Sequence, residues 1–494
     1  MKFFLIAPIL CTLIFGCSPE KAEKQKEVTP PVVKKQDEPR QPGCKPCHPM
    51  VLDKHHQMSC TDCHDGSDKS AVQEEAHLDL NSEPSHPKSM VKRCGECHHN
   101  EVKGVTASSH FTLADCTNLT RNLFGTKSRL ASKDNIPESE IPMTAGDLAD
   151  DLLRRSCLRC HLHSKGDRYP GVRHGSGCAA CHLDFEVGKL VTHHFLALPT
   201  DKQCLQCHYG NRVGFDYYGR FEHDLNEEYR TPYTTRQDFF RPFGVEFHQL
   251  VPDIHQKAGM ECVDCHSGRD LMGTSSVPSS LSCSDCHQPQ QLKSHLPASI
   301  TRSGSDYTLT TRREKKELRI PLMKDPAHDE FSTRVDCQVC HAQWSFNDQG
   351  LHFLRRDFDE YDDFERLTTQ GHFDVEKLLL NNLDFDKDEF EPSLKDQISG
   401  ELTRGVWYRS FSQRRWEKIP LGRNAEGTIM VTRPILDLHL SWTDEEENVR
   451  FDSVSPKDRS RAYRPYVPHT TGPAGLYYRN RIQRFLALEK QLNN

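Results

Sequence analysis

The sequence has few of the aliphatic side chains that normally build a protein core. Hydrophobic residues make up 35% of its 494 positions, charged residues make up 27%, and the mean hydropathy is −0.72. This apolar fraction is low for a globular chain of this length. The chain nevertheless contains 21 Cys, 28 His and 24 Phe, which is not the composition of a disordered protein. We therefore expect it to fold around something other than a conventional aliphatic core.

A basic excess is also missing. The 64 Lys and Arg residues are outnumbered by 71 Asp and Glu, which gives a formal net charge of −7. This balance disfavours a nucleic-acid binder, because such proteins attract phosphates with a surplus of positive charge. Long apolar runs are absent except at the very start of the chain, which excludes a polytopic membrane protein.

The single apolar run is predicted to be a targeting signal. Lys2 precedes the run FFLIAPILCTLIFG at residues 3–16, which is shorter than the roughly 20 residues that span a bilayer and fits a secretory signal. The end of this run, LIFG before Cys17, resembles a bacterial lipoprotein signal. That resemblance implies removal of residues 1–16 and acylation of Cys17, which would anchor the protein to a membrane. Residues 17–43 are rich in Lys, Glu, Gln and Pro and are predicted to form a disordered tether.

Most of the remaining cysteines belong to one repeated unit, CxxCH. Nine copies occur between residues 44 and 341. Their cysteine pairs are Cys44 and Cys47, Cys60 and Cys63, Cys94 and Cys97, Cys157 and Cys160, Cys178 and Cys181, Cys204 and Cys207, Cys262 and Cys265, Cys283 and Cys286, and Cys337 and Cys340. The histidines that follow them are His48, His64, His98, His161, His182, His208, His266, His287 and His341. We refer to these units as motifs one to nine.

The spacing of this unit predicts covalent haem. Two thiols three residues apart can add to the two vinyl groups of one haem, and the adjacent His can bind its iron as the proximal ligand. Zinc ribbons do not need a His after every CxxC, and disulfide pairing leaves the nine histidines unexplained. We therefore expect nine c-type haems, with roughly 33 residues for each. Residues 44–341 are predicted to be a nine-haem domain, mostly irregular, with short helices, little sheet and the porphyrins as its core.

Nineteen further histidines could supply distal iron ligands. Many precede a motif by a few residues, where they are better placed to reach a neighbouring haem than their own. The candidates are His55, His56, His86, His99, His174, His193, His194, His255 and His328. His163, two residues after a proximal His, is a weaker candidate, and a surface or propionate-contacting His is the alternative for each. With only nine Met residues, bis-His ligation and low potentials are expected rather than His–Met ligation.

These nine motifs resemble the bacterial multihaem c-type cytochromes, notably the outer-membrane lipoproteins of anaerobic respiration and extracellular electron transfer. Phrases such as HQKAGMECVDCH at 255–266 and HHQMSCTDCH at 55–64, where His leads into the motif, strengthen the resemblance. It covers residues 44–341. Pentahaem nitrite reductases of this superfamily use a CxxCK site, and none occurs in this sequence.

The stretch 209–261, between motifs six and seven, is unusually rich in aromatic residues and Arg. It holds Tyr209, Tyr217, Tyr218, Tyr229, Tyr233, Arg212, Arg220, Arg230, Arg236, Arg241, His223 and His248. One interpretation is an oxyanion pocket beside a haem with an open iron position. The interpretation that we favour is simpler, with aromatic rings packed on porphyrins and Arg paired with propionates.

Cys116 stands outside every motif. We expect it to be a buried free cysteine, with a redox, intermolecular or ligand role as the alternative.

Residues 342–494 contain no haem motif and are predicted to form a small α+β region, with a helix followed by a β-meander. A helical pattern covers residues 375–383. Period-two alternation at Leu436, Leu438, Leu440 and Trp442, followed by the turn DEEEN at 444–448, predicts a β-hairpin. His439 and His469 could each reach back to an iron. A cap over exposed haems or a docking surface is the other interpretation of this region.

The function expected from the sequence is electron transfer through nine haems in a protein that is lipid-anchored to the outer membrane. Its partners would be other redox proteins, such as periplasmic or outer-membrane cytochromes, that donate and accept electrons. Two alternatives stay open. One is a terminal reductase of a small nitrogen or sulfur oxyanion at a five-coordinate haem. The other is a filament in which subunits stack end to end as an electron conduit.

Overall fold

The computed structural model describes residues 42–492, apart from 210–212, 223–241, 246, 274–280, 292–295, 346, 350, 359–369, 385, 410–412, 416–418, 435–437 and 457–462. The predicted signal peptide, Cys17 and nearly all of the tether lie outside the described residues. The same holds for Arg212, His223, Tyr229, Arg230, Tyr233, Arg236 and Arg241 of the aromatic stretch. No helix among the described residues has the length and apolar character needed to cross a membrane.

Most helices are short, and many coincide with CxxCH units. The α-helices are α1 (Cys60–His64), α2 (Gln73–Ala76), α3 (Pro87–Arg93), α4 (His99–Ala107), α5 (Ser109–Thr112), α6 (Ala114–Leu123), α7 (Ala145–Arg155), α8 (Ala179–His182), α9 (Asp201–His208), α10 (Val213–Tyr217), α11 (Ile254–Ala258), α12 (Cys262–Cys265), α13 (Gly268–Leu271), α14 (Cys283–His287), α15 (Pro326–Phe331), α16 (Cys337–His341), α17 (Phe373–Asn382) and α18 (Tyr478–Leu492). The 3₁₀ turns among the described residues are η1 (Lys133–Asn135), η2 (Cys157–Cys160) and η4 (Pro289–Gln291).

The strands form several small sheets. They are β1 (Phe185–Glu186), β2 (Lys189–Leu190), β3 (Arg220–Glu222), β4 (Phe247–Gln249), β5 (Ile300–Ser303), β6 (Asp306–Thr310), β7 (Glu317–Arg319), β8 (Asn347–Gln349), β9 (Leu351–Arg356), β10 (Ser393–Lys395), β11 (Leu402–Arg404), β12 (Val406–Arg409), β13 (Gln413–Arg415), β14 (Leu421–Arg423), β15 (Ile429–Pro434), β16 (Leu438–Thr443), β17 (Val449–Val454) and β18 (Tyr463–Pro465). The strand order of the largest sheet is β12-β9-β16-β17.

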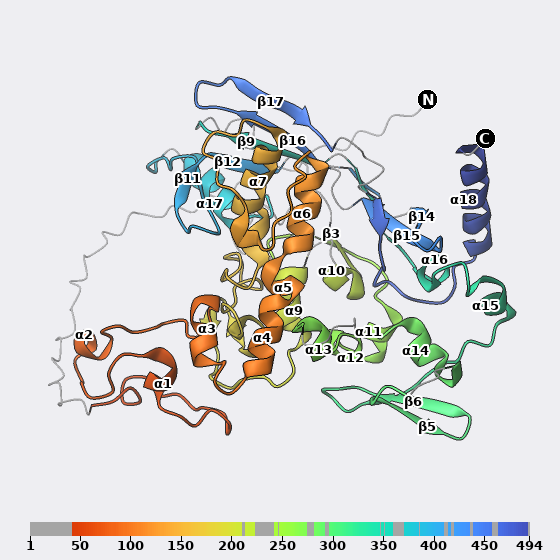
Figure 1. Ribbon diagram of the computed structural model, residues 1–494, viewed down its shortest axis with the longest axis horizontal. Helices are drawn as coiled ribbons and strands as arrows, with labels where there is room; N and C mark the ends of the chain where they lie inside the picture. The colour runs from red at the N-terminus through yellow and green to blue at the C-terminus, as the bar shows by residue number, and fades with distance from the viewer. Residues whose placement is uncertain are drawn as a thin grey trace, which may run out of the picture.

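The motif-bearing helices are spread along the molecule. Figure 1 shows α1 at one side, α9 near the centre, and α12, α14 and α16 following one another toward the C-terminal helix α18. The longer helices α4, α6 and α7 lie between motifs three and four in the sequence. In Figure 1 they extend from the row of motif-bearing helices toward the C-terminal sheet. The haem-motif part therefore forms an extended base, and the largest sheet lies above it.

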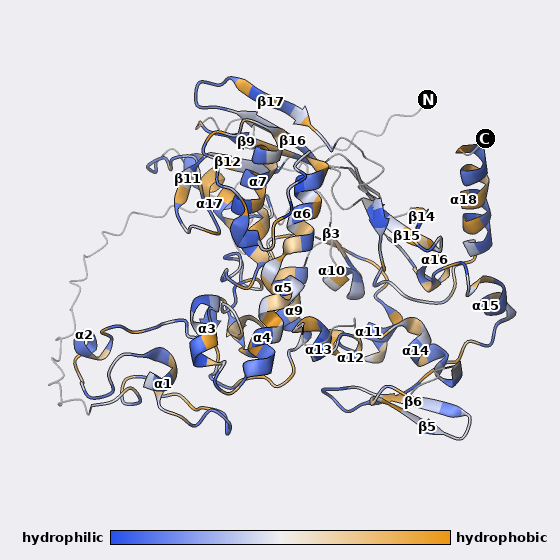
Figure 2. Cartoon of the chain, viewed as in Figure 1, coloured by the Kyte–Doolittle hydropathy of each residue, from blue (hydrophilic) through white to orange (hydrophobic). Residues whose placement is uncertain are grey.

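A conventional apolar core does exist, but it lies away from most motifs. Leu148 and Leu152 of α7 pack with Leu379 of α17, Trp407 of β12 and Leu440 of β16, and none of these side chains is more than 2% exposed. Figure 2 shows the apolar residues of α7 and α17 close to this sheet. Residues between motifs three and four and residues beyond 342 thus share one core. The boundary that we expected after residue 341 does not separate two packed bodies.

Polar contacts reinforce this junction. The Arg154 guanidinium donates to the Asp396 carboxylate over 2.5 Å, and Arg155 donates to the carbonyl of Gly405 over 2.8 Å. All three polar side chains are buried. Because charged groups are costly to bury without partners, these bonds fix how the C-terminal region sits on α7.

The C-terminal region is not the helix followed by a meander that we expected. β16 and β17 pair antiparallel across residues 444–448, at the place where the alternating pattern predicts a hairpin. However, β16 pairs in parallel with β9, which precedes α17. Strand β9 was not predicted from the sequence. Arg355 and Arg356 at its end are residue types that suggest an exposed segment, although both side chains are buried. Arg355 pairs with Asp357 and lies over the ring of Trp442.

The expectation that Cys116 is buried is wrong. Cys116 lies on α6 and its side chain is exposed. The face of α6 that packs inward carries Thr117, Asn118, Thr120, Arg121 and Leu123. This face is largely polar, so the sequence does not show which side of the helix is inside.

Candidate haem-binding sites

At most motifs the CxxCH unit forms a single helical turn. The backbone N–H of His48 donates to the carbonyl of Cys44 over 2.8 Å, and His98 does the same to Cys94 over 2.8 Å. α1, α14 and α16 each span a whole motif. Capping boxes start several of these turns, as where Ser59 and Asp62 bond each other's backbone at α1. Such a turn places both thiols and the His, at i, i+3 and i+4, on one side of the helix.

Seven of the motif histidines face a second histidine from elsewhere in the chain. The pairs, with the distance between ring centres, are His48 and His77 (6.0 Å), His64 and His193 (6.1 Å), His98 and His56 (6.3 Å), His208 and His110 (6.4 Å), His266 and His469 (6.3 Å), His287 and His255 (6.1 Å), and His341 and His328 (6.1 Å). The spacing is nearly constant although the sequence separations range from 13 to 203 residues.

This spacing fits an iron held between two imidazoles. A metal lies about 2.0–2.1 Å from each ligating nitrogen, and ring centres lie a further ~1.1 Å away, so bis-His ligation requires ring centres about 6.3 Å apart. Direct ring stacking would bring the centres closer, as in the pair His352 and His439 at 4.4 Å. The residues present therefore fit a haem at each of these seven places.

Hydrogen bonds orient the same rings. Nδ1 of His64, His287 and His341 donates to a backbone carbonyl at 2.7–2.9 Å. The carbonyls that accept from these motif histidines belong to Asn81, Pro321 and Gly472, respectively. Among the second histidines, Nδ1 of His56 donates to the Asp53 carboxylate and Nδ1 of His255 donates to the Asp253 carboxylate, each at 2.8 Å. Because these oxygens only accept, Nδ1 carries the proton and Nε2 keeps its lone pair for a metal.

In motif five, no second histidine among the described residues faces His182, but a hydrogen bond orients the His182 ring as in the other motifs. His182 donates from Nδ1 to the carbonyl of Leu196 over 2.7 Å. Its backbone N–H bonds the carbonyl of Cys178 over 3.0 Å, as in the other motifs. Its ring is therefore oriented as a proximal ligand would be.

Motif four differs from the others. Cys157–Cys160 form the 3₁₀ turn η2, and His161 has an extended backbone with φ −118° and ψ 167°. The ring of His161 is buried, and neither nitrogen makes a hydrogen bond of ordinary geometry with a described residue, although the backbone of Leu158 is near enough to influence the ring. Burial, followed by the charge of Lys133, lowers the pKa of His161 to about 3, so the ring is neutral near pH 7.

The predicted distal candidates divide into three groups. His56, His193, His255 and His328 each face a motif His, as given above. His86 faces His163 at 5.9 Å, and Nε2 of the buried His174 lies 3.8 Å from Sγ of Cys207. The structure does not bring His55, His99 or His194 against a motif His, and it leaves all three side chains exposed.

Two of the facing histidines were missed by the sequence analysis. His77 and His110 follow motifs instead of preceding them, and no local pattern distinguishes them from surface histidines. Their positions are set by tertiary packing, as His110 on α5 lies against His208 on α9. His469, which we considered as a residue that could reach back to an iron, faces His266 of motif seven.

Hydrogen bonds and electrostatic interactions between thiols indicate which motifs are neighbours. For three thiols the neighbour is the main cause of a raised pKa: Cys178 acts on Cys94, Cys204 on Cys262, and Cys337 on Cys283. For four others burial raises the pKa first and the neighbour second: Cys60 acts on Cys44, Cys94 on Cys63, Cys204 on Cys181, and Cys286 on Cys265. These hydrogen bonds and electrostatic interactions link motifs one, two, three, five, six, seven, eight and nine in that order.

The described part of the aromatic stretch 209–261 is packing rather than an open pocket. Tyr217 donates its hydroxyl to the carbonyl of Met260 over 2.7 Å, and Tyr218 donates to Asp201 over 2.6 Å. The Arg220 guanidinium lies over the rings of Phe215 and Tyr218. These side chains are therefore engaged with one another and with the helix of motif six.

Comparison of the chain with protein-family models, with curated proteins and with solved structures finds no match in any of the three.

Proposed function

We propose that this protein binds nine c-type haems covalently and that its function is to carry electrons among them. The observation that carries the proposal is the spacing of the seven facing histidine pairs, with ring centres 6.0–6.4 Å apart. Each pair includes the His of a CxxCH unit, so two thiols for thioether bonds lie one helical turn away. When bound, each haem would supply an iron that takes up and releases one electron.

The chain's own residues would hold and tune these groups. The eighteen motif thiols would tether the haems, and the motif histidines would be the proximal ligands. The second histidines of the facing pairs would complete bis-His ligation, which favours low potentials and leaves no open position for a substrate. Asp53 and Asp253, both buried, accept from Nδ1 of their histidines and so fix the rings and raise their basicity.

The interactions between thiols support transfer over short distances. They link neighbouring motifs in the order one, two, three, five, six, seven, eight and nine. Haems held by adjacent thiols would lie close together, so the proposed path runs along the row of helices in Figure 1.

We place this activity at the outer membrane. The lipoprotein signal and Cys17 support a lipid anchor, and covalent haem attachment fits an exported protein. The partners would then be other redox proteins, such as periplasmic or outer-membrane cytochromes, that donate and accept electrons.

Reductive titration of the exported protein tests the proposal. We expect nine electrons per molecule, followed by rapid oxidation on mixing with an oxidised small cytochrome, without any other substrate. Uptake of far fewer electrons would overturn the haem assignment. Oxidation that occurs only after addition of nitrite or sulfite would instead favour the terminal-reductase alternative.

A further inference from the structure

His174 is a buried histidine that lies against a thiol of a neighbouring motif. It is 2% exposed, and its Nε2 lies 3.8 Å from Sγ of Cys207, the second cysteine of motif six. Among the described residues, the ring has one other hydrogen-bond partner, which is the carbonyl of Gly175 at 2.6 Å. The side chain is therefore held between a backbone acceptor and a motif thiol.

The Gly175 carbonyl fixes which nitrogen of the His174 ring carries the proton. A carbonyl oxygen only accepts, so Nδ1 is the donor and Nε2 keeps its lone pair. Burial lowers the pKa of His174 below its usual value of 6.5, so the ring is neutral near pH 7. In the contact with Cys207, the thiol is therefore the donor and Nε2 is the acceptor.

Tight packing holds the ring in this position. Gly166 has φ +74°, and a Cβ added to it would lie 2.9 Å from Nε2 and 2.8 Å from Cδ2 of His174, so only glycine leaves room for the ring. The backbone N–H of His174 donates to the carbonyl of Lys165 over 2.9 Å, and that of Gly177 donates to Leu162 over 2.6 Å. The loop between motifs four and five thus closes on itself and presents the ring to motif six.

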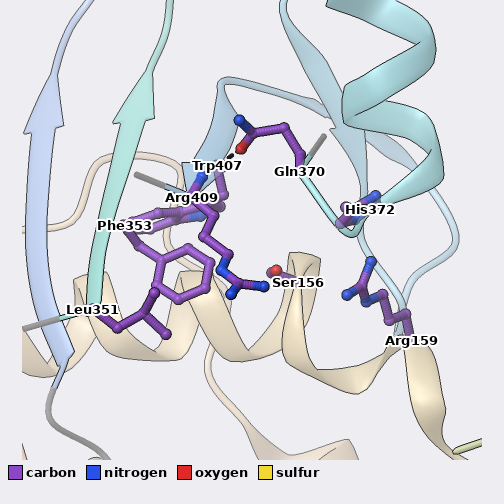
Figure 3. Close-up of a pocket in the computed structure, with 8 residues that line it drawn as sticks. All are labelled: Ser156, Arg159, Leu351, Phe353, Gln370, His372, Trp407 and Arg409. Atoms are coloured by element: carbon purple, nitrogen blue, oxygen red, sulfur yellow. Dashed lines mark hydrogen bonds between the residues drawn. The ribbon is translucent and has the colours of Figure 1, made fainter. Parts of the chain in front are cut away.

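Asp167 fixes the same loop to the rest of the molecule. Its buried carboxylate pairs with Arg159 of motif four over 2.6 Å and accepts from the backbone N–H of Phe373 over 3.2 Å. Figure 3 shows the Arg159 guanidinium pointing toward His372, at the cavity where motif four meets the C-terminal sheet. The position of His174 is therefore set by the packing of three separate parts of the chain.

A thiol beside a neutral imidazole suits the chemistry of haem attachment. Each thiol adds across a vinyl double bond: the S–H bond breaks, sulfur bonds the inner vinyl carbon, and a proton reaches the outer carbon, so no oxidant or reductant is consumed. The thiolate is the reactive form of cysteine, and an adjacent histidine commonly generates it. A thioether sulfur has no proton to donate, so this hydrogen bond exists only before attachment.

We propose that His174 is the general base for haem attachment at motif six. Its Nε2 would take the proton of the Cys207 thiol as sulfur bonds the inner vinyl carbon, and the imidazolium would return that proton to the outer carbon. The 3.8 Å contact shortens when the reacting partner is bound, as is usual for catalytic hydrogen bonds. Cys204, the other thiol of the motif, hydrogen-bonds Cys262 instead, so the effect is confined to Cys207. This inference rests on the proposed function, because it requires covalent haem.

Peptide mass spectrometry of the exported protein, after denaturation and thiol alkylation, tests the inference. In the wild type both cysteines of motif six should carry haem and resist alkylation. H174F keeps an aromatic ring without a base, and H174Q keeps a polar acceptor that takes no proton near pH 7. In both variants Cys207 should be alkylated in at least about ten times as many chains, because a general base contributes about 10²- to 10⁴-fold to a rate. H194F is the matched control, since His194 is exposed.

The other eight motifs in the same digest separate this role from the alternatives. Equal alkylation of Cys207 in wild type, H174F and H174Q would overturn the inference and leave the nine haems in place. Loss of thioethers at several motifs at once would also overturn it, because His174 would then be a packing residue. Intact thioethers with about one ninth of the iron in the high-spin state would make His174 an iron ligand and overturn it as well. A wild type without haem would overturn the proposed function, and this inference with it.

Discussion

The two consecutive histidines before motif two offer a sharp test of the ligand assignments. His56 faces His98 at 6.3 Å, packs against Phe195 and donates to Asp53, whereas its neighbour His55 is exposed. We predict that H56A removes the sixth ligand of one haem and that H55A removes none. One iron in nine would change, so about 11% of the total should become high-spin.

The assay is spin quantification by electron paramagnetic resonance on the oxidised protein, with total haem measured on the same sample. H56A should also lower the free energy of unfolding by about 1–3 kcal/mol, because the buried Asp53 loses one hydrogen-bond donor. H55A should change stability by less than about 0.5 kcal/mol. An equal high-spin fraction in both variants, or none in H56A, would refute the use of ring spacing to identify ligands.

Four further predictions concern other parts of the molecule. H77A should also convert about one ninth of the iron to high spin in the same assay, although its sequence context gives no hint of a ligand. Chemical denaturation should show L379A losing about 2–5 kcal/mol and its exposed neighbour L380A losing less than about 0.5 kcal/mol. Burial alone would raise the pKa of Asp396, but hydrogen bonds from its arginine partner and two backbone N–H groups lower it from 3.8. The stability it contributes should therefore be complete above pH 3.8 and be lost as pH falls below that value, so that wild type and D396N converge in acid denaturation. Maleimide should label Cys116 in the native protein, and slow labelling that requires denaturant would contradict its exposed position.

The sequence predicts the two thiols and the adjacent histidine of each site, but it predicts only some of the second histidines that face them. Apart from motif four, a CxxCH unit places two thiols and a His on one helical turn, so the predicted proximal set follows from the local sequence. The second histidines depend on which segments pack together. Of the adjacent pair His193 and His194, only His193 faces a motif His, because Leu52 forms a β-bridge with it and brings it toward motif two.

The C-terminal region was predicted less well, for two physical reasons. Its central strand β9 ends in two buried arginines, which hide the apolar alternation on which strand prediction depends. Its core is shared with α6 and α7, more than 200 residues earlier in the chain. No local pattern carries information about such a distant partner, so the topology could not be foreseen.

The mass of the denatured mature protein after thiol alkylation tests the central claim most directly. Nine thioether-linked haems, at about 0.6 kDa each, would add roughly 5.5 kDa to the lipidated chain, and Cys116 would be the one alkylated cysteine. A mass of polypeptide and lipid alone, with all 19 remaining cysteines alkylated, would contradict the haem assignment and every site built on it.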